Sequence, residues 1–294
     1  MQQPNLSHLA IFAAIAQHGS FQKAAAETGV STSAASHAIR GLEDRLGVSL
    51  FHRTTRSVSL TEAGQRLLER LQPALRDVAG AIEEMNNFRT TPTGTLRINT
   101  PRVASQLLVA PLMQRFLIAY PEIHLEIVEQ DAFVDIVAAG FDAGIRFEET
   151  VPEDMVGVRI GGPRRFAVIG SPDYFQRRGV PQHPGELARH EGVRYRFPSG
   201  RLYKWEFAQG DVKLDIEIKG RLTVADQQLA IRAAMDGIGL AFVLEDMAQD
   251  EIRQGRVASV LADWCPAFTG FMIYYPRQRQ MPSALRAFID MART

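Results

Sequence analysis

Cysteine, net charge and long apolar runs are all scarce in this chain of 294 residues, and each scarcity excludes a class of protein. The single cysteine, Cys265, has no partner for an internal disulfide and cannot build a zinc site of several thiolates. No run of about 18 uncharged apolar residues occurs, so no membrane span is expected. Residues 1–6 lack the basic start and apolar core of a secretion signal. The sequence therefore predicts a soluble, cytoplasmic protein.

The formal charge is zero, because 33 Lys and Arg residues balance 33 Asp and Glu residues. Residues 1–60 nevertheless carry five basic and three acidic side chains, and Arg53 and Arg56 lie close together. A local basic patch is therefore expected in a neutral protein. The apolar fraction of 46% is typical of a globular protein, and the length predicts about two domains.

Helical signals dominate the first 50 residues. A first helix is expected to end at Gly19, and Ser20 is placed to cap a short second helix. Gly29 permits a sharp turn, after which Ser31 can cap a third helix. Small alanines in the second helix allow it to cross the third closely, so the segment has the proportions of a helix-turn-helix.

The third helix has two contrasting faces. Its predicted buried stripe, at helical spacing, consists of Ala35, Ile39, Leu42 and Leu46. Its opposite face carries hydroxyl, imidazole and guanidinium groups, on Thr32, Ser33, Ser36, His37 and Arg40. Such groups can meet base edges or phosphates in the major groove of DNA. A merely solvated polar face is the alternative, but the neighbouring turn, wing and long helix favour DNA.

Residues 50–60 have the β-branched and polar composition of a short hairpin or wing. Arg53 and Arg56 on this wing are interpreted as phosphate contacts, which position a domain without reading sequence. Arg45 is expected to pair with Glu43, Asp44 or solvent.

Residues 61–88 are predicted to form one long helix that begins at an N-cap, Thr61. Its apolar residues follow heptad spacing, from Leu67 and Leu71 to Val78 and beyond. A core helix of one compact fold is one interpretation. A dimerising coiled coil is favoured, because the helix has no evident partner within its small domain.

After a predicted hinge near residues 90–94, strands and helices alternate. Strands are expected at residues 96–99, 124–129 and 143–147, and helices at 101–119 and 135–140. This order predicts a parallel sheet with right-handed crossovers. A second such unit is expected at 171–268, with a helix at 226–236, and the two units suggest a cleft between them.

Polar residues near strand ends are candidate ligand contacts in that cleft. Thr100 is expected to cap a helix that begins at Pro101, and the helix N-terminus would favour an anion. The candidate effector-binding residues are Thr100, Arg102, Ser105, Arg146, Ser199 and Asp226. The alternative is that Thr100 and Asp226 only cap helices, while Arg102 and Arg146 pair with surface acids such as Glu148.

Enzyme and metal motifs are absent from the sequence. No Gly-x-Ser-x-Gly, P-loop or His-Glu-x-x-His pattern occurs, and the histidines lack metal-ligand spacing. No catalytic residue, metal or cofactor is therefore expected.

The sequence of residues 5–65 resembles the winged helix-turn-helix of LysR-type transcriptional regulators. The match runs through residues 6–12, 20–26 and 36–46, and through Leu50-Phe51-His52-Arg53-Thr54 and Leu60-Thr61-Glu62-Ala63-Gly64. The resemblance continues over the whole chain, and residues 135–147, 200–207, 263–266 and 274–280 resemble the CrgA-like branch. Thr32-Ser33 departs from the Gln-Pro or Gln-Ser of many family members.

The resemblance implies an α/β protein with three parts: a winged helix-turn-helix at 1–60, a linker helix at 61–89 and an effector domain at 90–294. The effector domain would resemble periplasmic binding proteins, with one subdomain at about 95–169 and 269–294 and another at about 170–268. The implied partners are double-stranded DNA, a small anionic effector and further copies of the chain, in a dimer or tetramer. The implied DNA contacts are Ser31, Thr32, Ser33, Ser36, His37, Arg40, Arg53, Thr54 and Arg56. A solute-binding protein, or an α/β enzyme with an accessory DNA-binding domain, is the alternative.

Overall fold

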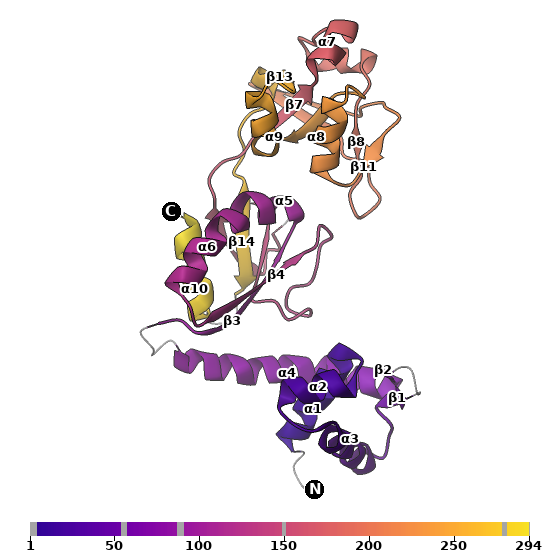
Figure 1. Ribbon diagram of the computed structural model, residues 1–294, viewed down its shortest axis with the longest axis vertical. Coiled ribbons are helices and arrows are strands. Elements are labelled where there is room, and N and C mark those ends of the chain that lie inside the picture. Colours follow the sequence, from indigo (N-terminus) through magenta and orange to yellow (C-terminus); the bar gives the residue numbers. More distant parts are fainter. Residues whose placement is uncertain (1–4, 54–57, 87–90, 149–150, 278–280, 294) are drawn as a thin grey trace. The chain divides into compact units, whose positions relative to one another are not determined.

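The computed structural model describes residues 5–53, 58–86, 91–148, 151–277 and 281–293. The chain divides into two compact units, residues 1–85 and 86–294 (Figure 1). Each unit has its own apolar core, and each is described separately below.

Three short helices form the body of the N-terminal unit: α1 (Leu6–His18), α2 (Phe21–Thr28) and α3 (Thr32–Leu46). The hydroxyl of Ser20 accepts from the Lys23 amide, and that of Ser31 accepts from the Ala34 amide. Gly19, Gly29 and Gly47 follow the three helices in the left-handed conformation that glycine adopts readily. The predicted helices and their caps are confirmed.

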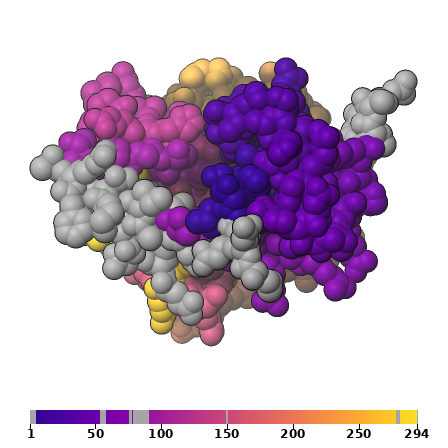
Figure 2. All heavy atoms as spheres, turned by 90° about the horizontal axis from the view of Figure 1, so that it is seen from below, coloured from indigo at the N-terminus to yellow at the C-terminus, as the bar shows by residue number. Residues whose placement is uncertain are grey.

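A two-stranded antiparallel wing and a long helix complete this unit. The wing pairs β1 (Phe51–Arg53) with β2 (Val58–Leu60), and α4 spans Glu62–Asn86. The Thr61 hydroxyl accepts from the Gly64 amide, as expected of an N-cap. Helix α4 extends well beyond the three short helices (Figure 1), and Figure 2 shows the surface atoms of this unit in indigo and violet.

Two expectations about apolar residues in this unit are wrong. The first half of α4 does have a partner in its own domain, because Leu67, Leu68, Leu71 and Leu75 pack on the core formed by α1–α3. Leu46, expected in the buried stripe of α3, is 48% exposed because it lies in the last turn, beyond the packed part of the helix.

The second unit contains a five-stranded mixed sheet in the order β4-β3-β5-β14-β6. Its strands are β3 (Gly94–Thr100), β4 (Ile123–Glu129), β5 (Ala143–Phe147), β6 (Met155–Ile160) and β14 (Phe271–Pro276). The predicted parallel arrangement holds for β3 with β4 and β5. It fails for β14, which returns from the end of the chain and lies antiparallel between β5 and β6.

The two faces of this sheet have different coverings. Helices α6 (Ala110–Ala119) and α10 (Ser283–Arg293) pack on one face, over the largest apolar core (Figure 1). Because side chains alternate along a strand, Asn99, Arg146 and Tyr274 point to the second face. A small cluster of Ile136, Phe141 and Tyr274 is the buried apolar core there.

The helix between β3 and β4 is not uniform. It begins as α5 (Arg102–Ala104), passes through a π-helical turn at Ser105–Val109 and continues as α6, with Pro111 in its first turn. The helix predicted at 135–140 is instead a turn. The Asp135 carboxylate accepts from the amides of Val137 and Ala138, and the Phe141 amide donates to the Ile136 carbonyl, so the chain reverses into β5.

The rest of this unit is a second α/β region. Its central sheet joins β7 (Phe166–Gly170) to β12 (Ala241–Leu244) and β13 (Ala258–Val260), and both pairings are antiparallel rather than parallel as predicted. Parallel pairing occurs between β8 (Arg194–Tyr195) and β11 (Thr223–Val224), and β9 (Trp205–Gln209) forms a hairpin with β10 (Val212–Ile216). The helices are α7 (Pro172–Arg178), α8 (Gln227–Met235) and α9 (Glu245–Arg253), with short 3₁₀ turns at Pro184–Arg189 and Ala262–Trp264.

Candidate DNA-binding surface and effector cleft

Helix α3 has the two faces that its sequence predicts. Ala35, Ile39 and Leu42 are buried against α1 and α2. On the opposite face, Ser36 is half-buried. The exposed polar residues there are Ser31, Thr32, Ser33, His37 and Arg40. Ser31 is engaged in capping, and its hydroxyl also lies 3.0 Å from that of Ser33.

Arg40 is the cation of this face that remains free for another molecule. Among the described residues, no carboxylate pairs with its guanidinium and no group accepts a hydrogen bond from it. A free guanidinium on an exposed helix can form a bidentate contact with a guanine edge or bind a phosphate.

Glu43 joins the end of α3 to the wing. One carboxylate oxygen accepts from the amides of Leu50 at 2.7 Å and Phe51 at 3.3 Å, while the other accepts from Arg53 Nη2 at 2.8 Å. The Arg53 guanidinium also lies 5.0 Å from the centre of the Phe21 ring. The wing arginine is thus held in place by protein contacts, although about a third of its side chain stays exposed.

The expected pairing of Arg45 with Glu43 is wrong, because Glu43 pairs with Arg53 and Arg45 Nη2 lies 3.1 Å from Nδ1 of His8; the expected exposure of Arg45 to solvent is confirmed. The predicted contacts Thr54 and Arg56 lie outside the described residues.

A cleft between α5 and α8 is the second candidate site. Arg102 Nη1 at the start of α5 donates to Oδ2 of Asp226 at 2.8 Å, and Asp226 Oδ1 accepts from the Leu229 amide at 2.9 Å. Asp226 therefore caps α8, as predicted, and binds Arg102 with its other oxygen. The cleft around this ion pair has a volume of only about 30 Å³, which is the volume of about one water molecule.

Electrostatics reinforce the bridge across the cleft. Burial by itself would raise the pKa of Asp226, but hydrogen bonds from Leu229 and Arg102 outweigh it and hold that pKa below its ordinary value. The hydrogen bond to Asp226 and the charge of Asp131 raise the pKa of Arg102. Burial, together with the charges of Asp131 and Asp226, raises the pKa of Tyr195 in the cleft wall. Arg102 and Asp226 are therefore both charged at neutral pH.

Thr100 does not cap α5 as expected. It is the last residue of β3, it is fully buried, and its hydroxyl donates to the Pro101 carbonyl at 3.2 Å. Asp131 takes the capping role, because its Oδ1 accepts from the Arg102 amide at 2.9 Å. The strand continues through Thr100, since that residue remains paired with Glu129 of β4.

Arg146 is only 6% exposed and lies on the second face of the sheet. Its guanidinium donates to Oδ1 of Asn99 at 2.6 Å and to the carbonyls of Ile145, Gln130 and Ala132. Burial lowers its pKa. The alternative pairing with Glu148 is wrong, because Glu148 pairs with Arg159 and the hydrogen-bond acceptors of Arg146 among the described residues are all neutral. Arg146 thus ties residues 130–132 to β5.

Only Arg102 and Asp226 of the six predicted effector residues line the cleft. Ser105 lies half-buried in the π-helical turn, and Ser199 is exposed at the tip of a turn closed by the Gly200 amide and the Phe197 carbonyl. Five lining residues were among those that the sequence did not single out: Gln106, Asp131, Tyr195, Gln227 and Met247. Asp131 follows the end of a strand, which was the available signal; the others lie on the π-helical turn, β8, α8 and α9, and their meeting depends on how these elements pack.

The described part of the chain gives no support for a metal site, a membrane-spanning helix or a nucleophilic cysteine. There, no group of three or more His, Cys, Asp or Glu side chains is arranged to hold a metal ion, and no helix is long and apolar enough to cross a membrane. Burial raises the pKa of Cys265 to about 11, so this thiol stays protonated at neutral pH and is a poor nucleophile.

A winged helix-turn-helix followed by an α/β domain with a polar cleft defines a ligand-responsive DNA-binding regulator. The sequence model of the bacterial regulatory helix-turn-helix proteins of the lysR family matches residues 6–65, and that of the LysR substrate binding domain matches residues 89–294. The chain therefore belongs to the LysR-type transcriptional regulators, and the predicted family is confirmed.

Characterised and uncharacterised relatives agree with this assignment. The chain is 44% identical to the uncharacterised HTH-type transcriptional regulator YcaN of Escherichia coli K12, over 99% of this chain and 95% of that one. It is 36% identical to PgrR of the same organism, over 99% and 97% of the two chains. The solved structure of CrgA from Neisseria meningitidis superposes with a TM-score of 0.61 at 28% identity, covering 99% of this chain and 98% of that one. These relatives are named transcriptional regulators rather than enzymes.

Proposed function

We propose that the exposed polar face of α3 reads the major groove of promoter DNA, while the wing contacts phosphates. The observation that carries this proposal is the exposed row of Thr32, Ser33, His37 and the unpaired Arg40 opposite a buried Ala35, Ile39 and Leu42. Arg53 would contact phosphate from a fixed position, because Glu43 and the Phe21 ring hold its guanidinium. A protein that binds promoter DNA in this way would act in the cytoplasm.

The protein would act as a homo-oligomer through the second half of α4. The first half of that helix is used in its own core, but Ala74 is exposed and Val78 is 52% exposed. These residues continue the heptad seam, so a second copy of α4 can cover them. A two-fold dimer would then present two recognition helices to paired half-sites.

The effector would be a small anion that takes the place of Asp226 on Arg102. A metabolite does not fit a cleft of about 30 Å³, so its binding requires α5 and α8 to separate and their ion pair to break. A carboxylate or phosphate can replace the lost partner of Arg102, which makes an anion the favoured ligand. Binding would shift the chain from the bridged to the separated arrangement.

Two arginine variants test the DNA-binding surface. The operator is first located by footprinting on DNA that flanks the gene. Arg40→Ala should then lose affinity for that operator and little for a random duplex. Arg53→Ala should lose affinity for both and reduce the salt slope by about one. Equal losses on both duplexes for Arg40→Ala would refute its base-reading role.

Asp226→Asn tests the effector cleft. The asparagine keeps an oxygen to cap α8 but removes the charge that holds Arg102. We expect the variant to give, without any effector, a footprint different from that of the wild type. Asp236→Asn, which disrupts the exposed pair with Arg232 at the other end of α8, is the matched control. Identical footprints for all three proteins would refute the bridge as a regulatory element.

A further inference from the structure

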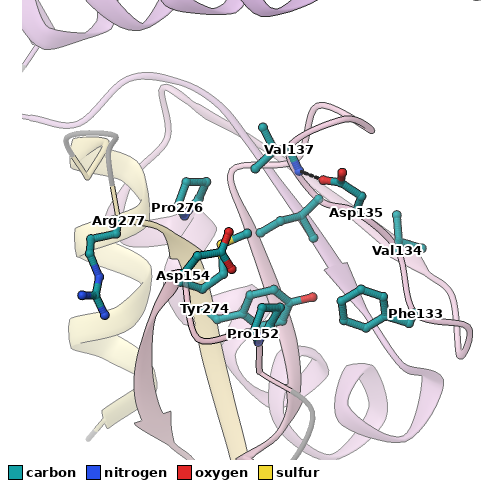
Figure 3. A pocket seen from close by; sticks show the side chains of 11 residues that line it. Phe133, Val134, Asp135, Val137, Pro152, Asp154, Tyr274, Pro276 and Arg277 are labelled. Carbon is teal, nitrogen blue, oxygen red and sulfur yellow. Dashed lines mark hydrogen bonds between the residues drawn. The ribbon is translucent and has the colours of Figure 1, made fainter.

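A second cavity, separate from the effector cleft, lies on the second face of the five-stranded sheet, to which Tyr274 points. Its volume is about 580 Å³, within the range of small-molecule sites, and it shares no lining residue with the cleft. One wall is formed by residues 133–137, after β4, and the opposite wall by the ends of β6 and β14 (Figure 3).

The walls of this cavity are mainly apolar. Phe133 and Val137 are 61% and 42% exposed, although both line it. Exposed large apolar side chains around a concavity are a feature of binding sites. The remaining apolar lining residues are Val134, Ile136, Pro152, Met155 and Pro276.

Tyr274 supplies an unsatisfied polar group to this cavity. The residue is 1% exposed, and no described residue forms a hydrogen bond with its hydroxyl. Its ring and hydroxyl occupy the space above Gly144, where a Cβ atom would lie 2.4 Å from the tyrosine ring. In Figure 3 the phenol points across the cavity toward the Phe133 ring. A buried hydroxyl that lacks a partner is costly, and a ligand that completes its hydrogen bond regains that cost.

The charges around the cavity select against anions. Asp135 and Asp154 line it, against the single cation Arg277. The buried guanidinium of Arg146, on the same face, already donates to four oxygen atoms and is not among the lining residues. Among the lining residues, a ligand carboxylate would therefore face two carboxylates and one cation.

We propose that this cavity is a second small-molecule site, which takes a compact apolar or aromatic compound with one uncharged hydrogen-bonding group directed at the Tyr274 hydroxyl. The site is independent of the effector proposed for the cleft. Benzyl alcohol is a suitable probe, because it has one ring and one hydroxyl. Toluene lacks the hydroxyl, and benzoate replaces it with a negative charge.

Two methionines can report on the two sites separately in the full-length protein. Met155 lines the cavity and Met247 lines the cleft. We would label the methionine methyl groups with ¹³C, assign these two signals by Met155→Leu and Met247→Leu, and titrate each probe. Benzyl alcohol should shift the Met155 signal and leave that of Met247 in place, and benzoate should bind Met155's site at least several-fold more weakly.

Tyr274→Phe tests the hydrogen bond, because it removes the hydroxyl and keeps the ring. We expect its affinity for benzyl alcohol to fall by roughly two- to tenfold and its affinity for toluene to stay unchanged. Val137→Trp should fill the cavity and abolish the shifts of the Met155 signal with both benzyl alcohol and toluene. Val180→Trp, at an exposed valine outside the cavity, should leave these shifts unchanged.

Several results would overturn the proposal. A Met155 signal that no probe moves would exclude a site of this chemistry. Equal losses of benzyl alcohol and toluene in Tyr274→Phe would exclude the hydrogen bond, and benzoate binding as tightly as benzyl alcohol would exclude selection by charge. None of these results bears on the footprint of Asp226→Asn, so the two proposals fail separately.

Discussion

Arg102 and Asp226, which are 124 positions apart in the sequence, form an ion pair of 2.8 Å between Nη1 and Oδ2. Both were candidates for ligand binding from sequence, and the structure pairs them with each other across the cleft. Asp226 has two tasks, since one oxygen binds Arg102 and the other caps α8. The two tasks can be separated by mutation.

Asp226→Ala should cost more stability than Asp226→Asn. Alanine loses the N-cap, worth about 1 kcal/mol, whereas asparagine keeps a capping oxygen and loses only a half-exposed ion pair worth at most about 1 kcal/mol. Thermal unfolding of the full-length protein measures both. Asp236→Ala, in an exposed pair on the same helix, is expected to change the Tm least of the three. An Asp226→Asn variant as unstable as Asp226→Ala would show that the ion pair, not the cap, dominates.

The sequence predicted features that depend on neighbouring residues and missed those that depend on distant ones. The caps Ser20 and Ser31 and the end of α1 at Gly19 follow from local rules, because each forms its hydrogen bond within about one helical turn. The sheet order did not follow, since β14, near the end of the chain, lies between β5 and β6 and pairs with residues far away in the sequence.

The candidate sites show the same division. The exposed face of α3 was read from helical periodicity alone. The environment of Arg146 was not, because its partners come from residues 99, 130 and 132, on other segments. The cavity beside Tyr274 likewise depends on the pairing of Tyr274 with Gly144, which no local pattern in either strand reveals.

Glu43 should be required for the wing to keep its position. In Glu43→Ala the amides of Leu50 and Phe51 lose their acceptor in a partly buried setting, which should cost roughly 1–3 kcal/mol. Arg53 would also lose its partner, so affinity for a random duplex should change together with the Tm. Fluorescence anisotropy and thermal unfolding measure the two effects.

Two further variants separate geometry from charge at this position. Glu43→Gln keeps an oxygen for the amides and should retain most of the stability. Asp44→Ala removes the same charge from an exposed neighbour and should leave the free energy of unfolding within about 0.5 kcal/mol of the wild-type value. If Asp44→Ala were as destabilising as Glu43→Ala, the contacts of Glu43 with the wing would not be the cause.

Gly64 should tolerate no side chain at all. A Cβ atom there would lie 2.1 Å from the Leu50 carbonyl oxygen, so Gly64→Ala must move α4 away from the chain that leads into the wing. We expect a loss of at least about 2 kcal/mol, measured as a lower Tm. Gly41→Ala is the matched control, because a Cβ in the interior of α3 meets nothing within 4 Å. That substitution should be neutral or stabilise by up to about 1 kcal/mol. Similar losses at both positions would contradict the close approach at Gly64.

His190 should make the second α/β region less stable in mild acid. The side chain is 8% exposed, its Nδ1 lies 3.2 Å from the Tyr174 hydroxyl, and burial and then the charge of Arg178 lower its pKa from 6.5. Glu186 acts in the opposite sense but does not reverse the shift. The folded protein therefore binds this proton less readily than the unfolded chain. The free energy of unfolding therefore keeps its full value, as far as His190 is concerned, above about pH 6.5. It decreases as the pH falls toward the lowered pKa of His190.

The comparison of wild type with His190→Gln isolates this contribution. Glutamine does not titrate and can still form a hydrogen bond with Tyr174, so the variant should lose less Tm than the wild type between pH 7.5 and pH 5.5. All other residues are the same in the two proteins, so the difference between their Tm curves arises from position 190. Parallel Tm curves for the two proteins would show that His190 binds its proton as readily in the folded protein as in the unfolded chain, since only a difference between those two pKa values makes stability depend on pH.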